Sequence, residues 1–320
     1  MIAPTLLLVL AVAGGTAGGT WLHRSRWPAH APRLGIWAWV VLSISTTSAA
    51  LLAGLALAVP TVRPTPLLTD LLDACWASVR AHYATPGGLI TGATGLVLAI
   101  AIATRLLVRL VAENLGSGRA RRDHRARLLL IGRPDPDRSV LVLPCADPAV
   151  YCLPGRPGLV VCTSAALDTL GADELQAVLA HEQAHLRGRH HRVLTLAAAL
   201  RSAFPFVPAF RLAETNLATL IEMRADDTAL VGSAPQTLGS ALVKLAGSVT
   251  PRVALGVGGG GERLLARVQR LSVGAPVMTG RAGAVAAAVG LVVLVAPVLV
   301  ALGPAAVAVA LDYCPPGLYG

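Results

Sequence analysis

The chain has 320 residues, of which 54% are hydrophobic and 14% charged, and its formal net charge at pH 7 is +10. This composition excludes an ordinary soluble globular protein, in which about a quarter of the residues are charged. The sequence therefore predicts an integral membrane protein with a basic face at the membrane surface. Nucleic-acid binding is not expected, because no aromatic side chains are interleaved with the basic ones.

Four long runs without a charged residue are predicted to cross the bilayer as helices. They cover residues 1–22, 34–62, 83–104 and 282–311. Each has at least the roughly 20 residues that a helix needs to cross the hydrocarbon core. The first run is expected to be a retained anchor rather than a signal peptide, because no basic residue precedes it.

The charges of the loops predict the topology. The loop after the first run carries Arg24, Arg26 and Arg33 and no acid, and residues 112–281 hold twenty basic and fourteen acidic residues. By the positive-inside rule both segments are cytosolic and both termini extracytoplasmic, as in a multi-pass protein of the cell membrane. The expected organisation is three spans in 1–111, a cytosolic domain in 112–281, a fourth span in 282–311 and an external tail in 312–320.

The cytosolic segment is predicted to be an α+β domain. After a charged linker at 116–127, a helix is expected to begin near Asp173, because apolar side chains recur there at three- and four-residue steps. Before this helix, proline-containing turns separate three β-rich runs, at residues 139–143, 150–153 and 159–162.

Several features outside the candidate site have simple explanations. The sequence "AFPFVPAF" at 203–210 breaks a helix and is either a contact with the membrane interface or a buried corner. "GVGGGG" at 256–261 is interpreted as a flexible linker. The helix after it is expected to meet lipid headgroups through Arg263, Arg267 and Arg270.

The five cysteines fall into two groups. Cys145, Cys152 and Cys162 lie in the segment expected in the reducing cytosol, in no zinc-binding spacing, and are interpreted as small residues of the strand core. Cys75 and Cys314 are expected outside, where a disulfide between them is a hypothesis that the sequence leaves open.

"AVLAHEQAHLRGRHH" at 177–191 contains an HExxH motif. His181 and His185 lie four residues apart and therefore on one helical face, where two imidazoles can bind one metal ion. Glu182 lies beside them and is directed at the metal-bound water as general base. The motif predicts a zinc hydrolase with one Zn²⁺ per chain. The alternative, two core histidines bonded to backbone carbonyls, would leave a costly buried carboxylate without a cation.

A third ligand is required, and the sequence offers two candidates. Gly188 and His191 complete the spacing HExxHxxGxxH. In "TLIEMRADDTAL", Glu222 and Asp226 share a helical face with small residues, so this helix can approach the first one and Asp226 can orient a ligating histidine. We favour Glu222, because the chain after Gly188 keeps a helical character. His191 remains the alternative ligand. If Glu222 is the third ligand, His190 and His191 are expected on the surface or behind the ligands.

These motifs, in the order of three spans, domain and one span, resemble the BlaR/MecR family of antirepressor membrane metallopeptidases over nearly the whole chain. The resemblance implies a gluzincin-like domain, zinc held by His181, His185 and Glu222, and cleavage of a cytosolic transcriptional repressor. Members often carry aspartate at the position of His190, so a supporting hydrogen bond is expected to differ here. The classical sensors continue into a penicillin-binding domain, whereas this chain stops at "DYCPPGLYG", so acylation by a β-lactam is not expected.

Two other functions use the same residues. HtpX-like and CAAX-prenyl-protease-like enzymes share both motifs and would process membrane proteins or remove damaged ones. A non-catalytic membrane sensor would keep the helix pair for structure alone. Whether the protein is an antirepressor or a membrane-processing protease, an extended substrate is expected to pair with the strand at 150–153 or 159–162. The inducing signal, the cleavage site and the oligomeric state are not predicted.

Overall fold

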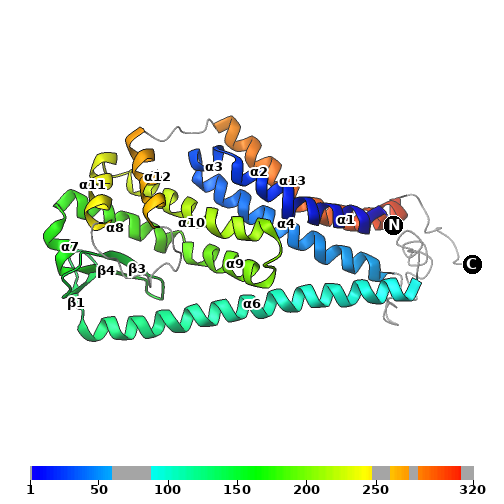
Figure 1. Ribbon diagram of the computed structural model, residues 1–320, viewed down its shortest axis with the longest axis horizontal. Coiled ribbons are helices and arrows are strands. Elements are labelled where there is room, and N and C mark those ends of the chain that lie inside the picture. Colours follow the sequence, from blue (N-terminus) through cyan, green and yellow to red (C-terminus); the bar gives the residue numbers. More distant parts are fainter. Residues whose placement is uncertain (1, 60–87, 247–259, 274–279, 311–320) are drawn as a thin grey trace, which may run out of the picture.

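The computed structural model describes residues 2–59, 88–246, 260–273 and 280–310. The described chain is elongated and mostly helical, with one small sheet at the end opposite the start of α1 and the end of α13 (Figure 1). Among the described residues, four helical segments are long and apolar enough to cross a membrane: Ile2–Arg24, Pro32–Ala58, Gly88–Ile131 and Gly280–Ala306. They overlap the four predicted runs, of which residues 1, 60–62, 83–87 and 311 lie outside the described part.

The apolar helices form one bundle. The helices α4 and α6 approach closely where a Cβ on Gly95 would lie 2.7 Å from the carbonyl oxygen of Gly54, so small residues are needed there. Ser45 on α4 donates a hydrogen bond of 2.8 Å to the carbonyl oxygen of Val293 on α13. The bundle consists of α1 (Ile2–Ala13), the π-helical turn η1 (Gly14–Gly18), α2 (Gly19–Arg24), α3 (Trp27–His30), α4 (Pro32–Ala58), α6 (Gly88–Ile131) and α13 (Gly280–Ala310).

The helix α6 continues far beyond its apolar part and lies along the length of the molecule (Figure 1). The predicted linker at 116–127 is wrong, because these residues are helical throughout. Arginine and alanine favour helices and no proline interrupts the segment. At its end, Leu128 is buried against the sheet. The helix therefore joins the bundle to the sheet as one rigid rod, and the expected boundary at 111/112 falls inside it.

The sheet has the strand order β1-β2-β4-β3. The strand β4 is parallel to β2 and antiparallel to β3, which leaves β3 at an edge. One face packs on the end of α6, and the other on the helices α8 (Ala172–Arg187) and α11 (Pro235–Ala246). The strands are β1 (Arg133–Asp135), which was not predicted, and β2 (Val140–Leu143), β3 (Val150–Leu153) and β4 (Leu159–Thr163), which lie within one residue of the predicted runs.

The remaining helices complete the domain and bring it against the bundle. Leu217 and Leu220 of α10 pack on Trp39 of α4 and Leu22 of α2. The arginine-rich first loop and the domain therefore lie at the same end of the bundle, as expected if they share one compartment. The helices are α7 (Ser164–Thr169), α8 (Ala172–Arg187), α9 (His190–Ala203), α10 (Pro208–Ala229), α11 (Pro235–Ala246) and α12 (Gly260–Val273).

Two of the three phenylalanines in the segment at 203–210 form a buried corner. Phe204 and Phe210 pack against Ile102 and Leu106 of α6, although Phe206 is 74% exposed. This helix-breaking segment thus fixes the turn between α9 and α10 on the rod formed by α6.

Two cysteines behave as predicted and one does not. Cys162 is buried and Cys152 packs against the same core, whereas Cys145 is exposed, because it lies beyond the end of β2. Cys75, Cys314 and most of the glycine run at 256–261 lie outside the described residues.

Candidate metal centre

The ends of α8 are defined by local hydrogen bonds. At its start, the Glu174 carboxylate accepts a bond of 2.9 Å from the Gly171 backbone and also binds Lys244 and Ser240 of α11. The hydrogen bonds from Lys244, Ser240 and Gly171 lower the pKa of Glu174 to about 2. At its other end, Arg189 adopts a left-handed conformation with φ 50°, which turns the chain into α9.

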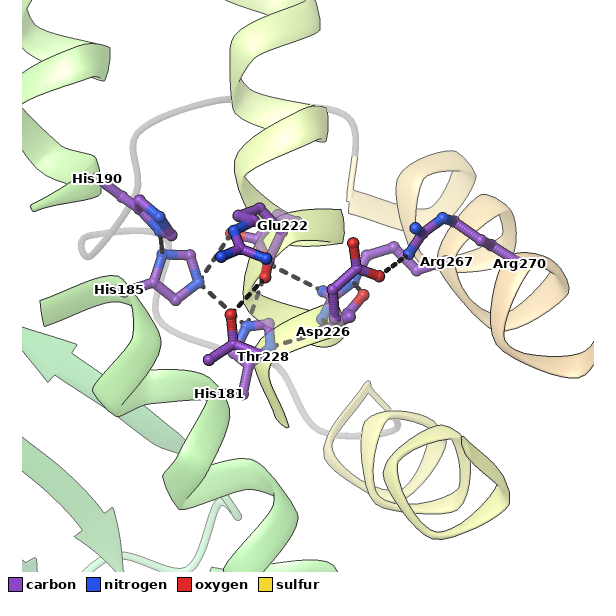
Figure 2. A network of polar contacts seen from close by, with 10 residues as sticks. His181, His185, His190, Glu222, Asp226, Thr228, Arg267 and Arg270 are labelled. Atoms are coloured by element: carbon purple, nitrogen blue, oxygen red, sulfur yellow. Dashed lines mark hydrogen bonds and ion pairs between the residues drawn. The ribbon is translucent and has the colours of Figure 1, made fainter. Parts of the chain in front are cut away.

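Two histidines of α8 and one glutamate of α10 converge on one point (Figure 2). The Nε2 atoms of His181 and His185 are 3.1 Å apart, and the Glu222 oxygens lie 3.6 and 3.5 Å from them, respectively. Four ligands at the Zn–N and Zn–O distances of about 2.0–2.1 Å are separated by about 3.3 Å in a tetrahedron. The donor types and their spacing therefore fit a zinc ion.

Small residues allow this approach. Ala225 and Ala229 of α10 are buried, at 0% and 1% exposure. Because their side chains take little space, the Glu222 carboxylate reaches the histidines on the neighbouring helix. His191, the alternative ligand, does not belong to this group of side chains; it lines a pocket with Arg121 and Arg192.

Behind the three side chains lies a buried ion-pair network (Figure 2). The Asp226 oxygen Oδ1 is 3.0 Å from His181 Nδ1, on the side of the ring away from Glu222. Arg267 of α12 donates two hydrogen bonds, of 2.8 and 2.6 Å, to Asp226, and its Nη1 is 3.0 Å from Glu222 Oε2. One guanidinium thus holds both acids of the ExxxD motif.

The expected contact of Arg267 and Arg270 with lipid headgroups is wrong. Arg267 is 9% exposed, and Arg270 binds Asp227 at 2.6 Å and the carbonyl oxygen of Ala29 at 3.1 Å. Buried carboxylates need cationic partners, and α12 supplies them. The signal in the sequence was the excess of acid in "IEMRADD", which a helix with arginines at one-turn spacing can neutralise. The side chain of Arg263 lies outside the described part.

The pKa values of the candidate ligands reflect this network. Burial lowers the pKa of His181, but the carboxylates of Asp226 and Glu222 raise it to about 9. Burial lowers the pKa of His185 to about 3. Burial opposes the ionisation of Glu222, yet His181 and Arg267 hold its pKa below the usual range. At pH 7 Glu222 is therefore an anion and the His185 ring is neutral, while a metal ion would have to displace a proton from His181.

Glu182 lies on the side of α8 that faces the edge strand β3. Burial raises the pKa of its carboxyl group, His181 lowers it, and the neighbouring Glu222 raises it further. The Cys152 thiol and main chain of β3 contact this carboxylate, and burial together with Glu182 raises the pKa of the thiol. A carboxylate with a raised pKa beside a candidate metal centre is suited to accept a proton.

His190 lies behind His185, one of the two positions that the sequence left open for it. It is buried, and its Nδ1 is 3.1 Å from His185 Nδ1. Burial lowers the pKa of His190 to about 4, so the ring is neutral and can accept the His185 Nδ1 proton. In the tautomer with a proton on His185 Nδ1, the lone pair of His185 Nε2 is directed at the centre. His190 then stands where members of the family that the chain resembles often carry an aspartate.

Comparison with known proteins agrees with this geometry. Residues 129–253, which include both motifs, match the model of Peptidase family M48. The chain is 35% identical over 121 residues to "Plastoglobule-localized metallopeptidase 48, chloroplastic" of Arabidopsis thaliana, and the match covers 35% of this chain and 35% of the relative. The chain thus spans about a third of that relative's length. No solved structure matches. The region that contains both motifs is therefore similar to M48 metallopeptidases and lies next to helices suited to membrane association.

Proposed function

We propose that the protein is a membrane-embedded, zinc-dependent endopeptidase. The main support for this activity is that His181, His185 and Glu222, from two helices, converge on a point beside the Glu182 carboxylate. The match to Peptidase family M48 supports the same activity. In this proposal the three convergent side chains bind the ion, and Asp226 and His190 orient the two imidazoles.

The residues around this point have the chemistry that peptide hydrolysis requires. Zinc, when bound, activates water and polarises the scissile carbonyl. Glu182 accepts a proton from the attacking water and transfers it to the leaving amine. An extended substrate pairs with the open edge of β3, so that its backbone runs past Cys152 and Glu182.

The BlaR/MecR resemblance supports a cytosolic transcriptional repressor as the substrate and a cytosolic domain. A second candidate is the processing or quality control of membrane proteins. It is favoured by the direct packing of α10, which carries Glu222, on α2 and α4 at the end of the apolar bundle. In that case the substrates would be other membrane proteins near the same surface.

The test compares the purified full-length protein with Glu182→Gln. We expect about one zinc per chain in both, and a loss of cleavage by a factor of about 10²–10⁴ in the variant. Zinc near zero in the unmodified protein would contradict the proposal and favour a non-catalytic sensor. Proteomics of cells with each form then separates the substrates: one stabilised transcription factor supports repressor cleavage, and many stabilised membrane proteins support quality control.

A further inference from the structure

A second concave site lies beside the metal centre. A pocket of about 540 Å³ is enclosed by the outer part of α6, the turn between β3 and β4, and the junction of α8 and α9. It lies next to the metal centre along the chain, because Leu186 follows the candidate ligand His185, and His191 follows His190, the residue behind His185. Six arginines line it: Arg121, Arg122, Arg125, Arg156, Arg189 and Arg192.

The charge of this basic pocket is not neutralised within the described residues. No carboxylate lines it, and none of its six arginines forms an ion pair there, whereas Arg138, Arg201 and Arg267 are all paired with acids. Burial and the neighbouring arginines lower the pKa of His191, and its buried Nδ1 has no hydrogen-bond partner in the described part of the chain. A pocket of this kind is complementary to an anion with several acceptor oxygens.

The basic pocket lies beyond the apolar part of α6. Arg109 lies near the end of the apolar part of α6, and Arg121 follows twelve residues later (121 − 109), which corresponds to about 18 Å of helix. The headgroup layer is only about 5–8 Å thick on each side. With α6 upright in a bilayer, the pocket would lie outside the headgroup layer, which favours an anion from the aqueous side.

We propose that the basic pocket is a subsite that binds acidic side chains of the protein cleaved at the neighbouring metal centre. The inference rests on the proposed endopeptidase function. A substrate strand paired with β3 passes Cys152 beside Glu182 and then reaches Pro154 and Arg156 at the wall of the basic pocket. Because successive residues of a strand advance about 3.3 Å, acidic residues a few positions from the scissile bond meet these arginines.

The test measures binding in the full-length protein with Glu182→Gln, so that cleavage is not needed. The probes are a fluorescein-labelled peptide with a run of glutamates and the same peptide with glutamines, followed by fluorescence anisotropy. We expect the glutamate peptide to bind at least about tenfold more tightly. The difference should shrink as salt is raised above about 0.1 M.

Two double variants with the same loss of charge locate the binding. Arg121→Gln with Arg192→Gln should weaken the glutamate peptide by about tenfold or more. Arg119→Gln with Arg127→Gln removes exposed arginines of α6 outside the basic pocket and should change binding by less than about twofold. Unchanged zinc content shows that each variant is folded. If the variant with both Arg121→Gln and Arg192→Gln misfolds, Arg192→Gln alone takes its place.

Several results would overturn the inference: equal binding of both peptides, equal weakening by both double variants, or RNA that binds the basic pocket more tightly than the glutamate peptide. Selective binding without any cleavage by the unmodified protein would instead contradict the endopeptidase function and leave the anion site intact. In a protein that does cleave, moving the glutamates along a peptide should move the cut with them, and a cut that stays in place would refute the subsite.

Discussion

Replacing Arg267 with methionine tests whether α12 positions the metal centre. The guanidinium makes two hydrogen bonds, of 2.8 and 2.6 Å, to Asp226 and lies 3.0 Å from a Glu222 oxygen. Asp226 is 1% exposed, so methionine would leave a buried carboxylate with His181 as its remaining close partner. Because Arg267 would no longer fix the Asp226 carboxylate, Asp226 would hold the His181 ring less firmly in one orientation.

The size of the effect follows from burial. Removing one partner of a buried ion pair costs about 3–5 kcal/mol, and we expect the lower end because His181 still faces both acids. For a domain of this size, about 3 kcal/mol corresponds to a fall of about 6–12 °C in the unfolding midpoint. The fall in the unfolding midpoint should be smaller when zinc is bound, because the charge of the ion compensates the charge of Glu222. Zinc affinity should decrease about 10–100-fold, as for other partners behind metal ligands.

The assay combines thermal unfolding of the detergent-solubilised protein with a zinc competition titration. Arg267→Lys keeps the charge but loses the planar guanidinium. Its unfolding midpoint and zinc affinity should therefore lie between those of the unmodified protein and Arg267→Met. Arg201→Met is the control, because Arg201 is 52% exposed and its ion pair with Glu214 is worth at most about 1 kcal/mol. Unchanged or tighter zinc binding by Arg267→Met would refute the reasoning, since the arginine would then compete with the ion.

The remaining predictions address the third ligand, the start of α8 and the helix bundle. His191→Ala should retain zinc and Glu222→Ala should lose it, as measured by metal analysis; the reverse would identify the alternative ligand. The pKa of Glu174 falls from 4.5 to about 2 on folding, so its stabilisation is complete above pH 4.5 and is lost as pH falls through 2. Glu174→Gln should therefore be less stable than the unmodified protein at neutral pH, and the stabilities of the two forms should converge at low pH, as measured by acid unfolding. A difference in stability that stays constant with pH would contradict this. Gly95→Val should destabilise the bundle by about 1–3 kcal/mol, because its Cβ meets the backbone of α4, whereas Gly116→Val, with nothing within 4 Å, should not. Equal melting shifts would refute the close helix contact.

Local pattern determined much of the architecture. The apolar runs, three strands within one residue, and the helix with the HExxH motif follow from composition and periodicity, which depend only on neighbouring residues. The same logic failed at 116–127, where a high charge suggested a linker. Charge does not oppose a helix, and packing of Leu128 on the sheet fixes its end.

Sequence by itself specified which chemical groups are present and which of them share one face of a helix. It identified the two histidines, the adjacent glutamate and the pair Glu222 and Asp226, because these spacings lie within single helices. Only the tertiary structure decided that Glu222 rather than His191 lies beside the histidines, that Arg267 is buried against both acids, and that arginines from three separate segments surround one pocket. These contacts join segments tens of residues apart, and their geometry depends on how whole helices pack, which no local spacing encodes.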